Sequence, residues 1–98
     1  MTGLASLREQ LDAADDRILQ AIAERCSVIR AIAEYKRVNG VPMSHPVRIR
    51  YVRERYRQFA ASIRMDADRL DRVAAELIEA ACELETTLMA QGEPEAAD

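Results

Sequence analysis

Apolar residues recur every three or four positions along the first third of the chain. The series, with two cations in line, is Leu7, Leu11, Ala14, Ile18, Ile22, Arg25, Ile29, Ile32 and Lys36. This is the spacing of one face of an α-helix that packs against another surface. The pattern predicts a first helix over about residues 5–38, ended by Asn39-Gly40. At 1.5 Å per residue such a helix is roughly 50 Å long.

Two shorter helices are predicted by the same criterion. After a loop at residues 39–45, Pro46 suits the first turn of a second helix. Its apolar stripe is Ile49, Val52, Tyr56, Phe59 and Ile63. A third helix is expected from Asp66 or Asp68 to about Ala90. Its stripe is Leu70, Val73, Leu77, Ala81, Leu84 and Leu88. Because no strand pattern appears, the predicted fold class is all-α, with three helices and a very long first one.

The predicted first helix is too long for the rest of the chain to cover. The 98 residues make one domain with a modest core, and a compact globule of this size has a radius of gyration near 13 Å, as a rough guide. We therefore expect a second chain to cover the overhang, which predicts a homodimer. The domain is expected over residues 1–90, followed by an acidic, disordered tail over residues 91–98.

Composition narrows the classes of function. With 49% hydrophobic residues, 32% charged residues, three Gly and three Pro, the chain is typical of a soluble helical protein. The net charge is −3, and the tail holds as many acids as that excess, so nothing indicates binding to nucleic acid or to an anionic membrane. The start lacks the apolar region of a signal peptide, and we expect a cytoplasmic protein. A single His and two separated Cys predict neither a structural metal nor a disulfide framework.

Arg25 and Lys36 interrupt the apolar stripe of the first helix. They are 11 residues apart, close to three turns, so they share a face. A buried cation needs an anionic partner, and the stripe contains no carboxylate. Two interpretations stay open: the cations reach water or an acid of another helix, or their anion is a ligand. In the second case, Arg48 and Glu85 would complete a pocket for a small dicarboxylate. The other arginines of the second helix are interpreted as a solvated face.

The first predicted helix carries a set of residues at fixed spacings. The set is Leu7, Arg8, Glu9, Leu11, Asp12, Asp15, Ile18, Leu19, Ile22, Ala23, Glu24, Arg25, Ala33 and Lys36. It resembles the first helix of the all-helical (type II) chorismate mutases. The spacings of that family also hold, with 17 residues from Arg8 to Arg25, 11 more to Lys36 and 12 more to Arg48. The resemblance continues without gaps over about residues 4–90.

The resemblance implies an intertwined homodimer of three-helix subunits, in which each active site takes one arginine from the partner's first helix. Here that residue would be Arg8. The helix geometry agrees, because 17 residues turn Arg8 about 260° away from Arg25, off its face. The resemblance further implies that Arg8 and Arg25 bind the two carboxylates of the substrate. Arg48 and Lys36 would complete the cationic lining, and Lys36 would also reach the ether oxygen.

The reaction implied by the resemblance is the Claisen rearrangement of chorismate to prephenate, in the shikimate pathway to aromatic amino acids. It is unimolecular and needs no cofactor, metal or nucleophile, so the enzyme would be an isomerase. Its task is to hold the diaxial, chair-like conformer and to stabilise the charge that develops on the ether oxygen. The catalytic roles would fall to Arg25, Lys36 and Glu85. Some small mutases of this type work with a partner enzyme of the same pathway.

The position that usually accepts a hydrogen bond from the substrate's C4 hydroxyl departs from the family's pattern. It is normally Glu, and here it is Ile49. A shifted register would use Arg53-Glu54 instead, but it needs an insertion balanced by a deletion and turns core positions outward. The ungapped register with Arg48 and Ile49 is therefore preferred. Without the C4 contact, isochorismate (as in isochorismate-pyruvate lyases) and 4-amino-4-deoxychorismate stay open as substrates beside chorismate, and a non-catalytic helical dimer is the competing class.

Two positions of the third helix also differ from the family. The common Ser is Ala81, and the second donor to the ether oxygen, often Gln, is Glu85. A carboxyl group donates a hydrogen bond only when it is protonated. We therefore expect a protonated Glu85 in the working enzyme, with turnover that falls as the pH rises.

Overall fold

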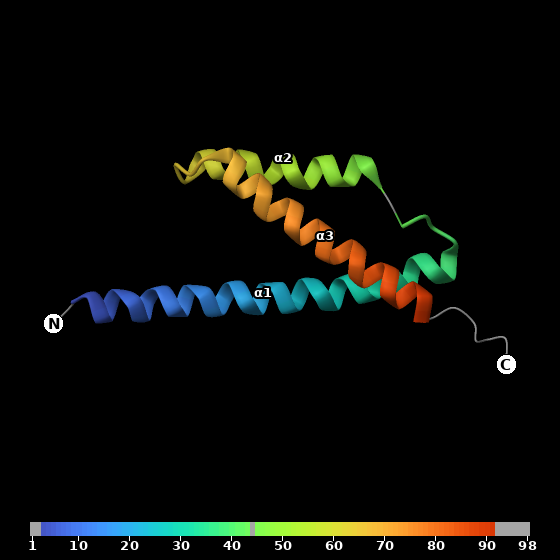
Figure 1. The fold of residues 1–98 in the computed structure, drawn as a ribbon, viewed down its shortest axis with the longest axis horizontal. Coiled ribbons are helices and arrows are strands. Elements are labelled where there is room, and N and C mark those ends of the chain that lie inside the picture. The colour runs from blue at the N-terminus through green and yellow to red at the C-terminus, as the bar shows by residue number, and fades with distance from the viewer. Residues whose placement is uncertain (1–2, 44, 92–98) are drawn as a thin grey trace.

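The computed structural model describes residues 3–43 and 45–91 as three helices and their connections (Figure 1). They are α1 (Leu4–Asn39), α2 (Pro46–Ser62) and α3 (Ala67–Gln91). No strand occurs among the described residues, so the predicted all-α fold class with a very long first helix of 36 residues is confirmed. Gln91, assigned to the tail from the sequence, ends α3, and residues 92–98 lie outside the described residues. None of the described helices is both long and apolar enough to cross a bilayer.

Local residue chemistry explains where the helices begin and end. At the end of α1, Gly40 takes a left-handed conformation (φ 63°) and donates its N–H to the carbonyl of Lys36, a conformation that Gly adopts without strain. Pro46 begins α2, where its missing N–H has no helical partner to lose. In front of α3, the Asp66 carboxylate accepts the N–H of Asp68 at 2.9 Å, as an N-cap residue does.

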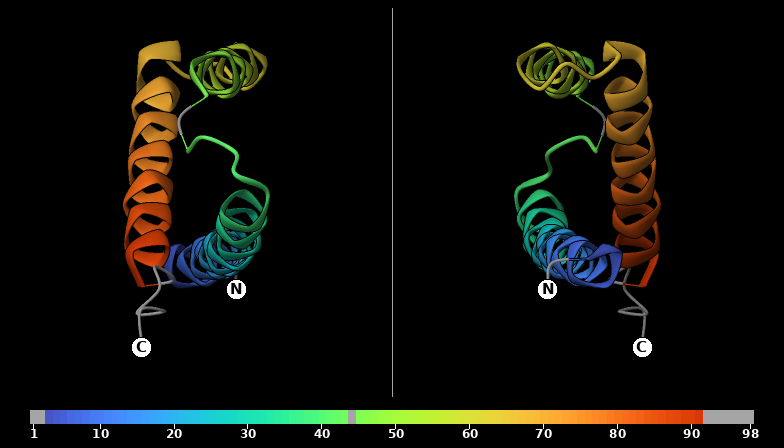
Figure 2. Two further views of the ribbon diagram at one scale, coloured as in Figure 1. Left: turned by 90° about the vertical axis from the view of Figure 1, so that its right-hand side faces the viewer. Right: turned by 90° about the vertical axis from the view of Figure 1, so that its left-hand side faces the viewer.

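The fold is organised around α3. This helix packs against both α1 and α2, whereas the described parts of α1 and α2 make no packing contact with each other. Figure 1 shows α3 running diagonally from α2 to the C-terminal half of α1, and Figure 2 shows α1 and α2 near opposite ends of α3. Any site that combines residues of α1 and α2 within one chain therefore depends on α3 for its geometry.

A single chain is extended rather than compact. Its dimensions are 65 × 28 × 15 Å and its radius of gyration is 17.8 Å, against about 13 Å for a compact chain of this length. It exposes 7784 Å², whereas a compact monomer of 11.0 kDa exposes about 5,600 Å². The N-terminal half of α1 projects beyond α3 (Figure 1). The excess area is as large as a typical protein–protein interface.

The predicted apolar stripes are covered only in part within one chain. The buried apolar residues are Ile29, Ala33, Ala60 and Ala74. Leu7 and Leu11, on the projecting half of α1, are 58% and 61% exposed. Of the apolar stripe predicted on α2, Ile49, Val52 and Tyr56 are half-buried, whereas Phe59 and Ile63 are exposed and the fully buried position is Ala60. The periodicity identified the apolar face correctly but did not indicate whether the same chain covers it.

Candidate active site

Lys36 and Glu85 form an ion pair across the interface between α1 and α3. The lysine Nζ lies 2.9 Å from Oε1 of the glutamate, and only 11% and 10% of the two side chains are exposed. The same Nζ donates to the main-chain carbonyl of Met43 at 2.9 Å, in the loop between α1 and α2. Within one chain, the anion that Lys36 needs is thus an acid of another helix, and it is one of the predicted site residues.

The burial of this pair makes it informative about function. Glu85 is the one charged residue among those described that is classed as buried. A buried ion pair generally adds little stability compared with two apolar residues of similar size. A role of this pair in binding or catalysis, rather than in stability, stays a prediction. Since Lys36 donates to Glu85 here, the contact fits an ionised carboxylate, and the protonated form stays a prediction for the substrate-bound enzyme.

Arg25 lies on the same interface, three turns before Lys36. Its side chain is half-buried and lines a small cavity of about 40 Å³ together with Ala81 of α3. The other lining residues are Ile22, Cys26, Ile29, Leu77, Ala80 and Leu84. Ala81 contributes a methyl group where the family often has a hydroxyl, so the wall opposite Arg25 is apolar. The structure therefore brings four predicted site residues to the α1–α3 interface: Arg25, Lys36, Ala81 and Glu85.

Arg48 and Ile49 lie in the first turn of α2, away from this group within one chain. The guanidinium of Arg48 lies 5.0 Å from the centroid of the Tyr51 ring, as in a cation–π contact. Arg48 also lines a separate hollow at the start of α2, and Ile49 is half-buried. The contact between Lys36 and Met43 ties the loop that leads into α2 to the α1–α3 interface.

Arg53, the arginine of the shifted register, is engaged elsewhere. Its Nε and Nη2 each donate to the Asp71 carboxylate of α3 at 2.7 Å. A bidentate pair of this kind holds the guanidinium in one orientation. Arg53 is therefore directed toward α3, and the ungapped register, with Arg48 and Ile49 at the substrate positions, stays a prediction.

Arg8 lies exposed on the projecting half of α1. The chain's own α3 crosses α1 at the other half (Figure 1). The structure therefore does not bring Arg8 to Arg25 or Lys36 within one chain. The role of Arg8 in the site of a partner chain stays a prediction.

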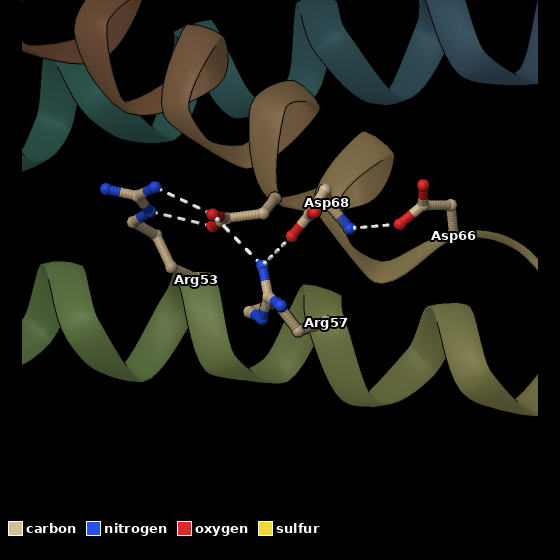
Figure 3. A network of polar contacts seen from close by, with 5 residues as sticks. Arg53, Arg57, Asp66 and Asp68 are labelled. Carbon is tan, nitrogen blue, oxygen red and sulfur yellow. Dashed lines mark hydrogen bonds and ion pairs between the residues drawn. The ribbon is translucent and has the colours of Figure 1, made fainter.

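A second polar cluster, at the other end of α3, was missed in the sequence. Arg53 and Arg57 of α2 bind Asp68 and Asp71 of α3, and we call these four residues the α2–α3 clamp (Figure 3). The hydrogen bond from Arg53 holds the pKa of Asp71 below its usual range, against the opposing effect of desolvation. A signal was available, because two arginines four residues apart and two aspartates three apart each share one helix face.

The described residues offer cationic recognition rather than an assembled metal site. In residues 3–43 and 45–91, no three His, Cys, Asp or Glu side chains gather where they could hold a metal ion. Cys26 and Cys82 are free and half-buried. The α1–α3 interface presents an arginine, a lysine and one carboxyl group, which together can bind a carboxylate and direct hydrogen bonds to a neutral oxygen.

The fold and this interface define a small all-helical protein with a shielded lysine–glutamate pair between two of its helices. Comparison with known proteins identifies its family. The chorismate mutase type II family model matches residues 7–86. The chain belongs to the type II chorismate mutase family, and with it to the isomerases.

Individual relatives agree with this assignment. A 4-amino-4-deoxychorismate mutase of Streptomyces pristinaespiralis is 37% identical over 89 residues, covering 91% of this chain and 69% of the relative. One of Streptomyces venezuelae is 33% identical over 88 residues, covering 90% and 85%. A chorismate mutase of Methanocaldococcus jannaschii is 36% identical over 63 residues, covering 64% of each chain. The similarity to the two Streptomyces proteins thus spans nearly all of this chain.

Proposed function

We propose that this chain catalyses the Claisen rearrangement of chorismate to prephenate at the α1–α3 interface. The observation that carries the proposal is the meeting of Lys36 and Glu85 at 2.9 Å, inside the segment that matches the family. Arg25 lies on the same interface. Because bonds break and form within one substrate molecule, the site has to fix a conformer and stabilise charge, and it needs no nucleophile.

Each residue of the interface has a role in this reaction. Arg25 binds one substrate carboxylate through its planar, two-pronged guanidinium. As the carbon–oxygen bond of the ether breaks and the new carbon–carbon bond forms, negative charge grows on the ether oxygen. Lys36 donates a hydrogen bond to that oxygen, in a place where water is largely excluded and the interaction is strong. Glu85, when protonated, adds a second donor, since its carboxyl group already lies beside the lysine.

The role of Glu85 is tested by replacing it with an amide, which donates at every pH. We expect wild-type turnover to fall as the pH rises and Glu85 loses its proton. The Glu85→Gln variant should keep its turnover over the same range, because its donor does not ionise. Initial rates from pH 5 to pH 9, with substrate saturating, measure both profiles. A flat wild-type profile, or a Glu85→Ala variant that is faster at every pH, would remove Glu85 from the mechanism.

We also propose that the enzyme is a homodimer with shared sites. The proposal is supported by the exposed apolar residues of the projecting half of α1 and by the exposure of Arg8 on that half. Arg8 of one chain would bind the second substrate carboxylate in the site of the other. Mixing Arg8→Ala and Arg25→Ala chains should then restore activity, because one of the two sites in each mixed dimer is intact. Absence of recovery in demonstrated mixed dimers contradicts the shared site.

A second candidate substrate is 4-amino-4-deoxychorismate. Two relatives that match about nine tenths of this chain are mutases of that compound. Ile49 does not favour this candidate, because a cationic C4 amine would be held better by the carboxylate that Ile49 replaces. Comparing kcat/KM for chorismate, isochorismate and the amino analogue decides between them. A folded protein that converts none of the three is a non-catalytic member of the family, and the proposal fails.

A further inference from the structure

The α2–α3 clamp lies outside the α1–α3 interface, and the proposed reaction does not use it. We propose that Asp71 is a positioning residue for substrate binding. Through the clamp it sets the orientation of α2, and so the place of Arg48 and Ile49 relative to α1. This inference rests on the proposed function, because it concerns residues assigned to substrate binding.

The clamp is a directional contact. Asp71 accepts two hydrogen bonds from Arg53 at 2.7 Å each and a third from Nη1 of Arg57 at 3.3 Å. The same Nη1 donates to Asp68 at 2.9 Å. Figure 3 shows Arg53 and Arg57 reaching from successive turns of α2 toward the start of α3. Two attachment points one turn apart oppose both rotation and sliding of α2, since either motion breaks at least one of them.

The apolar contacts of α2 are less directional. Within the described chain α2 packs only on α3, and its one buried residue is Ala60. Ile49, Val52 and Tyr56 are only half-buried, so apolar packing within the chain defines the rotation of α2 less sharply than the ion pairs do. Asp71 is the best-shielded member of the clamp, with 17% of its side chain exposed against 47% for Arg53. It is also the residue that both arginines share, so removing its charge weakens both attachments.

The orientation of α2 at the clamp determines where Arg48 lies at the site. Arg48 precedes Arg53 by five residues on the same continuous helix, about 7.5 Å along its axis. Because a helix moves as a rigid body over this length, a rotation at Arg53 displaces Arg48 as well. The donors to the ether oxygen lie on α1 and α3 and stay in place. Loss of the clamp should therefore weaken substrate binding while the chemical step is largely kept.

The test is the kinetics of Asp71→Asn in the full-length protein. We expect KM to rise severalfold with kcat changed by less than twofold, because binding to α2 is impaired and the ether-oxygen donors are not. A purely structural role gives the opposite pattern, since partial unfolding lowers the active fraction and hence kcat at unchanged KM.

Two further variants serve as controls. Glu34→Gln breaks the exposed ion pair between Glu34 and Arg37 on α1, a similar contact that does not touch α2, and should leave KM unchanged. Asp68→Asn removes one contact of Arg57 and should raise KM less than Asp71→Asn, and it keeps the proposal testable if Asp71→Asn does not fold.

Three results would overturn the inference. One is an unchanged KM in an active, folded Asp71→Asn enzyme. The second is a lower KM, which would show that a freed Arg53 binds substrate itself. The third is a wild-type protein that neither binds nor converts any of the three candidate substrates. In that case the proposed function fails too, whereas the first two results leave it standing.

Discussion

The two ends of α3 carry ion pairs of different kinds. At its C-terminal end, Glu85 meets Lys36 of α1 in a place that excludes most water, with about a tenth of each side chain exposed. At its N-terminal end, the α2–α3 clamp lies at the surface, where Arg53 is about half exposed. The first contact joins α3 to α1, and the second joins it to α2.

The difference indicates that one end of α3 is suited to a reacting group and the other end to holding α2 in one orientation. A shielded cation interacts strongly with any charge that develops beside it, so the Lys36 end suits the reacting oxygen. An exposed cluster is weak in energy but several bonds with fixed directions still define an orientation. Neither contact could replace the other. A surface lysine would stabilise the ether oxygen poorly, and a single buried ion pair would not define the rotation of α2.

The largest expected effect comes from removing one partner of the shielded ion pair between Lys36 and Glu85. Lys36→Met keeps the length of the side chain, removes its charge and leaves Glu85 buried without a partner. We expect a loss of about 3 kcal/mol in the free energy of unfolding and a fall of roughly 10²–10³ in kcat/KM. Urea unfolding at one fixed chain concentration and steady-state kinetics measure the two losses. A variant with wild-type activity would show that Lys36 does not act on the substrate.

Removing both partners separates stability from activity. Lys36→Met with Glu85→Leu fills the same space with apolar groups and leaves no unpaired charge. The free energy of unfolding should return to within about 1 kcal/mol of wild type or exceed it, while activity stays lost. If the double variant is as unstable as Lys36→Met alone, the pair has a structural role that apolar packing cannot replace.

A smaller effect is expected in the turn between α2 and α3. Arg64 has φ 59°, and the N–H groups of Arg64 and Met65 bond the carbonyls of Ala61 and Ala60, which is the pattern of a Schellman motif. Arg64→Gly relieves the left-handed strain and should stabilise the protein by about 0.5–1 kcal/mol. Arg64→Ala keeps the strain and is the matched control. Equal thermal unfolding of both variants would contradict the assignment.

The smallest expected effect is the contribution of the exposed clamp to the free energy of unfolding. This contribution should depend on pH. The hydrogen bond from Arg53 keeps the pKa of Asp71 below its ordinary value of 3.8. A lowered pKa in the folded state means that the contribution to stability is complete above the unfolded value and is lost as the pH falls through the folded one. The stability difference between wild type and Asp71→Asn, followed by urea unfolding, should therefore be present at pH 7 and be lost in acid, as the pH falls below 3.8 and through the lowered pKa of Asp71. A difference that persists in acid would have another cause.

The sequence predicted the bounds of the helices well and the contacts between the helices less well. The apolar period and Gly40 placed the end of α1 within one residue of Asn39. The sequence also predicted that Lys36 and Glu85 belong to one site. Their direct ion pair was not predicted, because it depends on where α1 and α3 cross, and the apolar periodicity gives no information about that. Phe59 lies on the predicted apolar stripe of α2 but is exposed, because periodicity identifies an apolar face and not what covers it.

The clamp illustrates a different limit. Arg53 and Arg57 were taken for a solvated face because charges on one helix usually are exposed. Their partners lie on another helix, and the register between two helices is set by the turn that joins them. A turn with a left-handed Arg64 is hard to foresee, since Gly is the usual residue there. Contacts between helices thus needed the structure, while positions along each helix did not.

The projecting half of α1 has a consequence for the amount of enzyme a cell must make. A stripe of leucines and isoleucines that finds no cover in its own chain is stabilised only when another chain arrives, so folding and association are one event under the proposed dimer. Dilution below the dissociation constant of the dimer should then lower activity more steeply than in proportion to the chain concentration.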